Sequence, residues 1–92
     1  MYKITDYSYN QAKKLNVNIK PSTKANFKID IYDIAGNLIT SIGHKDYKDY
    51  PTYLKENGKD YAEERRKLYK KRHEKDRSIK GSRGYYADKI LW

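Results

Sequence analysis

The 92-residue chain has no cysteine, which excludes disulfide bonds and thiolate metal sites. It also has no apolar run approaching the roughly 20 residues that span a membrane, so no membrane partner is expected. The first ten residues, MYKITDYSYN, lack the apolar core of a signal peptide. We therefore expect a protein that is not secreted.

Large apolar side chains are also scarce. The chain has one Phe, one Trp and one Met beside eleven Tyr, and hydrophobic residues make up 37% of it. A chain of this length buries only about 60–65% of its unfolded surface, and a buried Tyr needs a hydrogen-bond partner for its hydroxyl. We expect one small domain, residues 1–92, of modest stability that a bound partner would raise.

Basic residues, in contrast, are abundant and unevenly placed. The chain has 21 basic and 12 acidic residues, a net charge of +9. Residues 65–83 hold ten of the basic residues, including all five Arg, against Glu74 and Asp76. A localised basic segment favours a polyanionic partner. The alternative is a solvated face with intrahelical ion pairs that serves solubility.

Alternating hydrophobicity predicts a β-hairpin. The segment FKIDIYD, residues 27–33, places Phe27, Ile29 and Ile31 on one face and Lys28, Asp30 and Tyr32 on the other. The turn AGN allows positive φ at Gly36 and Asn37, and residues 38–43 return as the second strand. Residues 17–20 also alternate. Because a lone hairpin is unstable in water, helices must cover its apolar face.

Capping and turn residues bound the predicted helices. These are about 9–15 after a Ser8–Gln11 capping box, a short helix from Pro51 to Asn57-Gly58, about 61–76 after Asp60 and Glu63, and YYADKILW after Ser82. The expected fold class is α+β: a β-hairpin, which residues 17–20 can extend to three strands, packed against two or three helices. The predicted core is Leu15, Phe27, Ile29, Ile31, Leu38, Ile42, Leu54, Leu68, Tyr86, Ile90 and Leu91, with Trp92 over it.

The basic segment is the leading candidate site. Its Arg and Lys side chains can contact phosphates, while Tyr69, Tyr85 and Tyr86 can stack on bases. Such binding is independent of sequence and weakens steeply with salt. No helix-turn-helix or zinc-finger motif is present, so base readout is not expected. The residues expected to bind nucleic acid are Arg65, Arg66, Lys70, Arg72, His73, Arg77 and Arg83.

A tyrosine patch is the second candidate surface. Three tyrosines recur every third residue in YKDYPTY, residues 47–53, which suits either a protein interface or a small core with few aliphatic residues. The tail YYADKILW either folds back onto the core or inserts into another protein. The predicted protein-interface residues are Tyr47, Tyr50, Tyr53, Tyr85 and Trp92.

Catalytic and metal-binding patterns are weak. His44 and His73 are the only imidazoles, and a metal site needs three or four convergent ligands. The chain has no nucleophile elbow and no phosphate-binding glycine loop. We expect a non-enzymatic protein without a metal or cofactor.

Four stretches together resemble a known protein family: YSYNQAKKL, DYPTYLKENG, AEERRKLYKKRHEKDR and GSRGYYADKILW. The family consists of small basic proteins encoded by large double-stranded DNA viruses and bacteriophages. It carries no known activity, so no catalytic residue transfers. The resemblance implies a viral origin, and with it a place in the virion or in the host-cell cytoplasm or nucleus. The matching positions are Glu64, Arg65, Arg66, Tyr69, Arg72, His73, Gly81, Ser82, Gly84, Leu91 and Trp92.

These observations predict a small basic viral protein, associated with the virion, that binds DNA non-specifically through phosphates in genome packaging or condensation. The expected partner is double-stranded DNA or, since charge serves both, an acidic protein surface. The alternative is a minor structural capsid component that bridges coat proteins. A third hypothesis is a small nuclease, or nuclease accessory, that uses His73 and Glu74.

Overall fold

The sheet contains the predicted hairpin and a third strand beside it. Strands β1 (Asn18–Pro21), β2 (Phe27–Tyr32) and β3 (Leu38–His44) are antiparallel in the order β1-β2-β3. The hairpin and the third strand are therefore confirmed. In the turn, Gly36 has the expected positive φ, at 92°, but Asn37 does not.

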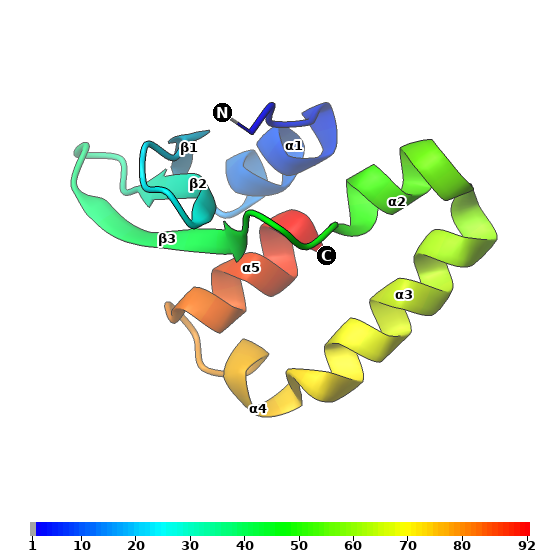
Figure 1. The fold of residues 1–92 in the computed structure, drawn as a ribbon. Helices are drawn as coiled ribbons and strands as arrows, with labels where there is room; N and C mark the ends of the chain where they lie inside the picture. The colour runs from blue at the N-terminus through cyan, green and yellow to red at the C-terminus, as the bar shows by residue number, and fades with distance from the viewer. Residues whose placement is uncertain (1) are drawn as a thin grey trace.

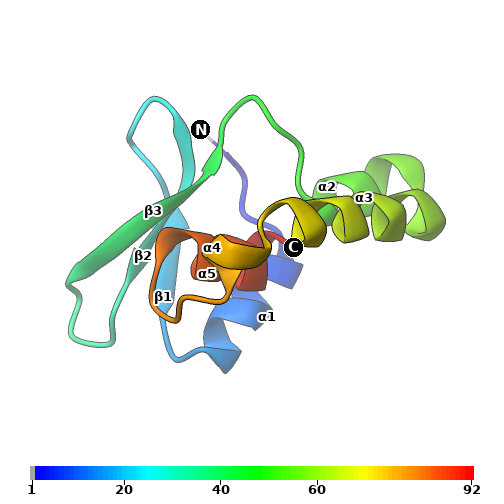
Figure 2. The same cartoon turned by 90° about the horizontal axis from the view of Figure 1, so that it is seen from below.

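Five helices complete the α+β fold of the computed structural model, which describes residues 2–92 (Figure 1). They are α1 (Asp6–Lys14), α2 (Tyr50–Asn57), α3 (Lys59–Arg72), α4 (Glu74–Arg77) and α5 (Arg83–Leu91). Helices α1 and α5 lie beside each other against the sheet, whereas α2 and α3 extend away from it (Figure 2). We call α2, α3 and α4 the helical arm.

The first helix begins one turn earlier than predicted. Thr5 is its N-cap, and the Thr5 hydroxyl accepts a hydrogen bond from the Ser8 amide at 3.3 Å. Ser8 is instead fully buried inside the helix and donates to the Ile90 carbonyl at 2.9 Å. The predicted Ser8–Gln11 capping box is wrong because Thr5 provides the cap before it.

The long helix predicted over residues 61–76 is divided in two. Helix α3 begins at Lys59, directly after Gly58, and ends at Arg72, and the backbone at His73 leaves the helical conformation. The Arg77 guanidinium donates through Nε to the Lys70 carbonyl at 3.1 Å. That bond occupies a carbonyl in the last turn of α3, and the chain then turns back toward α5.

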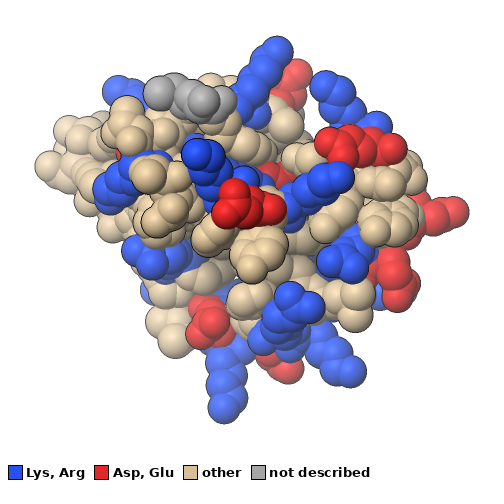
Figure 3. Space-filling view, in the orientation of Figure 1, with Lys and Arg blue, Asp and Glu red and all other residues tan. Residues whose placement is uncertain are grey.

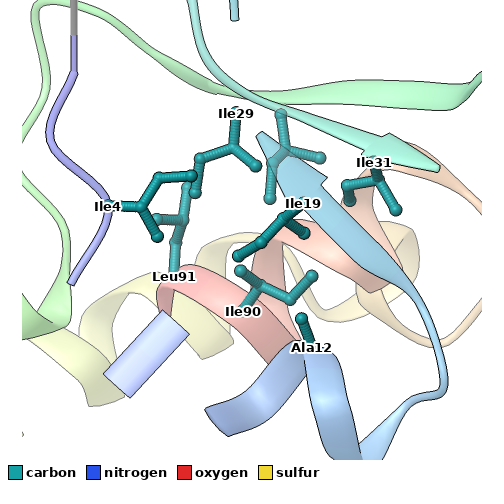
Figure 4. Packing of buried hydrophobic residues seen from close by; sticks show 8 residues of the cluster. Ile4, Ala12, Ile19, Ile29, Ile31, Ile90 and Leu91 are labelled. Carbon is teal, nitrogen blue, oxygen red and sulfur yellow. The ribbon is translucent and has the colours of Figure 1, made fainter. Parts of the chain in front are cut away.

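The core lies between the sheet and helices α1 and α5 (Figure 4). Ile29, Ile31, Ile42, Ile90 and Leu91 are buried, as predicted. The tail YYADKILW therefore forms α5 and folds back onto the core. The members of this cluster that the prediction missed are Ile4, Ala12 and Ile19, and Tyr50 and Ala62 are buried outside it.

Several predicted core residues lie at the surface instead. Leu38, Leu54 and Leu68 are 48%, 39% and 44% exposed. The prediction was wrong for them because the outer strand β3 and the helical arm each have only one side covered. The remaining four, which are only half-buried, are Leu15, Phe27, Tyr86 and Trp92.

A buried ion pair connects the sheet to the helical arm. Lys28 Nζ lies 3.0 Å from Asp49 Oδ2, and it also donates to the Tyr47 carbonyl. Asp49 is the N-cap of α2, accepting from the Thr52 amide at 3.0 Å, and it accepts from the Tyr2 hydroxyl at 2.8 Å. This pair fixes the 44–49 loop and the start of the helical arm relative to β2.

Candidate nucleic-acid interface

A hollow of about 800 Å³ lies between the helical arm, α5 and the 44–49 loop. Its lining contains five cationic side chains against Asp49 and Asp76. On the face shown in Figure 3, basic groups outnumber acidic groups, and both are scattered over uncharged surface. The cationic side chains are Lys28, Lys48, Arg65, Arg72 and Arg83.

Two of these cations are neutralised by carboxylates. Lys28 pairs with Asp49, and Lys48 Nζ lies 2.7 Å from Glu56 Oε1. The other three are arginines, and none has a carboxylate oxygen within 4.0 Å among residues 2–92. The hollow therefore combines a basic lining with three guanidinium groups available to an anion.

The three arginines converge from two helices. Arg65 and Arg72 are seven residues apart on α3, so they share one helical face. The Arg65 guanidinium lies 5.4 Å from the centroid of the Tyr53 ring. Arg83, the first residue of α5, lies 4.8 Å from the centroid of the Phe27 ring. Aromatic contacts orient two of the guanidinium groups without neutralising them.

Arg66 belongs to a different face of α3. Its guanidinium lies 3.6 Å from the centroid of the Tyr50 ring, and Nη2 donates to the Tyr7 hydroxyl at 3.1 Å. Nη1 is also 3.5 Å from Glu63 Oε2. Arg66 therefore fastens α3 to α1 and α2, and it does not line the hollow.

Lys70 and Arg77 are likewise engaged within the molecule. Lys70 Nζ lies 2.7 Å from Oδ1 of Asp88, a fully buried residue of α5. Arg77 donates to the Lys70 carbonyl. Lys70 therefore holds the helical arm against α5, and Arg77 joins α4 to α3. Of the seven predicted residues, Arg65, Arg72, Arg83 and the half-buried His73 line the hollow.

A row of aromatic rings forms one wall of the hollow. Tyr69 and Trp92 are stacked, with centroids 4.3 Å apart and planes 7° apart. His73 lies on Tyr69 at 4.4 Å, and Tyr53 is 6.2 Å from Trp92. Burial, followed by the charges of Asp88 and Asp76, raises the pKa of Tyr69 to about 12. The row joins α3 to the end of α5 through side chains.

The predicted tyrosine patch is not one surface. Tyr50 is buried and donates to Glu63 Oε2 at 2.6 Å, so its predicted interface role is wrong and the core alternative holds for it. Tyr47 is largely exposed, while Tyr53, Tyr85 and Trp92 are half-buried. Tyr47 and Tyr53 both line the hollow, whereas Tyr50 does not.

Within residues 2–92, no group of three or more His, Cys, Asp or Glu side chains is arranged to hold a metal ion. Across the same residues, every helix is too short or too polar to cross a membrane. No protein-family model, curated protein or solved structure matches the chain.

Proposed function

We propose that the protein binds nucleic acid through phosphate groups, with Arg65, Arg72 and Arg83 as its principal contacts. One observation carries the proposal: three guanidinium groups that have no carboxylate partner in the described part of the chain, residues 2–92, line one hollow. Guanidinium presents a planar fork of donors that matches two oxygens of a phosphate. An anion in the hollow would supply the negative charge that these three arginines lack as a partner.

The surrounding surface supports attraction of a long polyanion. Four exposed lysines follow the arginines along α3, α4 and the next turn, namely Lys67, Lys71, Lys75 and Lys80. Their summed potential extends beyond the hollow and accelerates encounter at low salt. Contacts of this kind read no sequence, which suits the packaging or condensation of a genome. The viral setting of that role rests on the sequence resemblance.

The two other hypotheses gain less from the geometry. The capsid alternative depended on the tyrosine patch and the C-terminal tail, but Tyr50 is buried and α5 packs into the core. The nuclease hypothesis depended on His73 and Glu74. The His73 ring packs on Tyr69, and its Nδ1 is 3.7 Å from Asp76 Oδ2. Both contacts of His73 are therefore with residues other than Glu74, so the geometry does not favour a nuclease that pairs the two.

Fluorescence anisotropy of a labelled random-sequence duplex, titrated at several salt concentrations, tests the proposal. The triple variant Arg65→Gln, Arg72→Gln, Arg83→Gln should flatten the plot of log affinity against log salt by about 2–3. The matched control is Lys3→Gln, Lys13→Gln, Lys14→Gln, which removes three exposed charges outside the hollow. Equal slopes for the two triple variants would show that the hollow is not the phosphate site.

A further inference from the structure

Exposed apolar side chains stand beside the arginines at the hollow. Tyr47 is 72% exposed, Ile79 is 61% exposed, and both line the hollow together with the partly exposed Leu68. Leu68 lies three residues after Arg65 and four before Arg72, on the face of α3 that carries both. A surface that met only phosphates would gain nothing from these apolar groups.

The occupant of the hollow must therefore present apolar faces as well as negative charge. An unpaired nucleotide has both, because its base offers two flat faces and its phosphate one negative charge. We infer that the hollow binds a single-stranded segment of nucleic acid, with bases stacked on its aromatic and apolar walls. This inference rests on the proposed function and names the form of nucleic acid that the same site takes.

The two walls suit a flat ring. On the loop side, the Tyr47 ring lies 5.0 Å from the His44 ring, and both side chains are exposed. The lining also contains Tyr69 and Trp92, the stacked pair described above, and Leu68. The volume of about 800 Å³ falls within the range of roughly 300–1,000 Å³ that is usual for ligand sites.

A duplex cannot use these walls. Its bases are stacked on one another, so it exposes only phosphates, sugars and the base edges in its grooves. Duplex DNA would therefore meet the arginines alone. A single strand would add the free energy of stacking to the same phosphate contacts, and the site should prefer it.

The test compares three labelled probes of equal length at one salt concentration, each titrated with the full-length protein. The probes are an oligothymidylate of about twelve nucleotides, an abasic strand with the same phosphates, and a duplex. The oligothymidylate should bind at least about tenfold more tightly than the abasic strand. Trp92 is the only tryptophan, so its fluorescence should also change with oligothymidylate and not with the abasic strand.

Two variants examine the walls separately. Tyr47→Ala and Leu68→Ala change exposed side chains, so they should leave the fold intact, and each should weaken oligothymidylate binding about fivefold or more. Binding of the abasic strand should not change. Tyr9→Ala, an exposed tyrosine outside the hollow, is the matched control and should alter neither.

The outcomes separate the inference from the proposed function. Equal affinity for oligothymidylate and the abasic strand would overturn stacking and leave phosphate binding intact. Displacement of oligothymidylate by a polyglutamate peptide of equal charge, as effective as unlabelled oligothymidylate, would also overturn it, because charge alone would then suffice. Binding of none of the probes would overturn the proposed function itself.

Discussion

The buried pair of Lys28 and Asp49 makes the sharpest prediction about stability. Their side chains are 7% and 1% exposed, with Nζ and Oδ2 3.0 Å apart. Lys28→Met keeps an unbranched side chain, one heavy atom shorter, and removes its charge. The Asp49 carboxylate would then remain buried, with only the Tyr2 hydroxyl and the Thr52 amide as donors.

Removing one partner of a buried ion pair costs about 3–5 kcal/mol, because the other charge stays uncompensated. Urea unfolding followed by helical circular dichroism measures this loss. For a slope near 1–1.5 kcal/mol/M, a loss of about 3 kcal/mol lowers the urea midpoint by roughly 2–3 M. Such a change is a large fraction of the total stability of a small domain.

A control and a double variant make the prediction decisive. Lys45→Met removes an exposed lysine just after β3 and should change stability by no more than about 0.5 kcal/mol. Adding Asp49→Asn to Lys28→Met should restore part of the loss, because the stranded charge is gone. If Lys28→Met resembles Lys45→Met, the pair does not stabilise the fold and the reasoning is refuted.

Three further predictions follow from the same structure. Lys70→Met should destabilise the protein by about 2–3 kcal/mol, because the Asp88 carboxylate stays buried without this partner. The affinity for phosphate, measured by anisotropy, should change little. A loss of affinity without a loss of stability would contradict this. Ser82→Ala removes the cap that accepts from the Tyr85 amide and should cost about 1 kcal/mol in urea unfolding, whereas an unchanged midpoint would argue against the cap. Because burial raises the pKa of Tyr69 from 10.0 to about 12, the folded state keeps a proton that the unfolded chain releases. The unfolding free energy should therefore fall as pH rises from 10 to 12, and urea titrations should show a smaller fall in Tyr69→Phe; equal falls would contradict the shifted pKa.

Local patterns in the sequence were sufficient for the elements with strong periodicity or caps. Alternation identified the hairpin, and Ser82 was recognised as the cap of α5. Asn57 and Gly58 were recognised as the end of α2. These features depend on neighbours only a few residues away, which a sequence displays directly.

Burial of polar residues could not be read in the same way. Lys28 and Asp30 share a strand with the core isoleucines, but both are buried. Their partners are Asp49 and Ser41, which lie 21 and 11 residues further along the chain. A local sequence pattern cannot indicate a hydrogen-bond partner at that distance. The hydrophobic alternation therefore predicted the burial of only one face of β2.

The candidate site shows the same division. Its arginines were identified from charge alone, yet charge did not separate Arg65 from Arg66. Their surroundings differ because Arg66 meets Tyr7, 59 residues away, whereas Arg65 faces the hollow. The place of Leu68 in the lining was missed, because the sequence assigned this leucine of a narrow apolar helix edge to the core.

The central claim is that nucleic acid occupies the hollow between the helical arm, α5 and the 44–49 loop. Backbone amide NMR spectra of the labelled protein, recorded during titration with an oligothymidylate, test it most directly. The account predicts that the largest shift changes fall in residues 44–48, 65–72 and 79–84. Changes centred on α1 or the β2–β3 turn, or spread evenly over the exposed lysines, would contradict it.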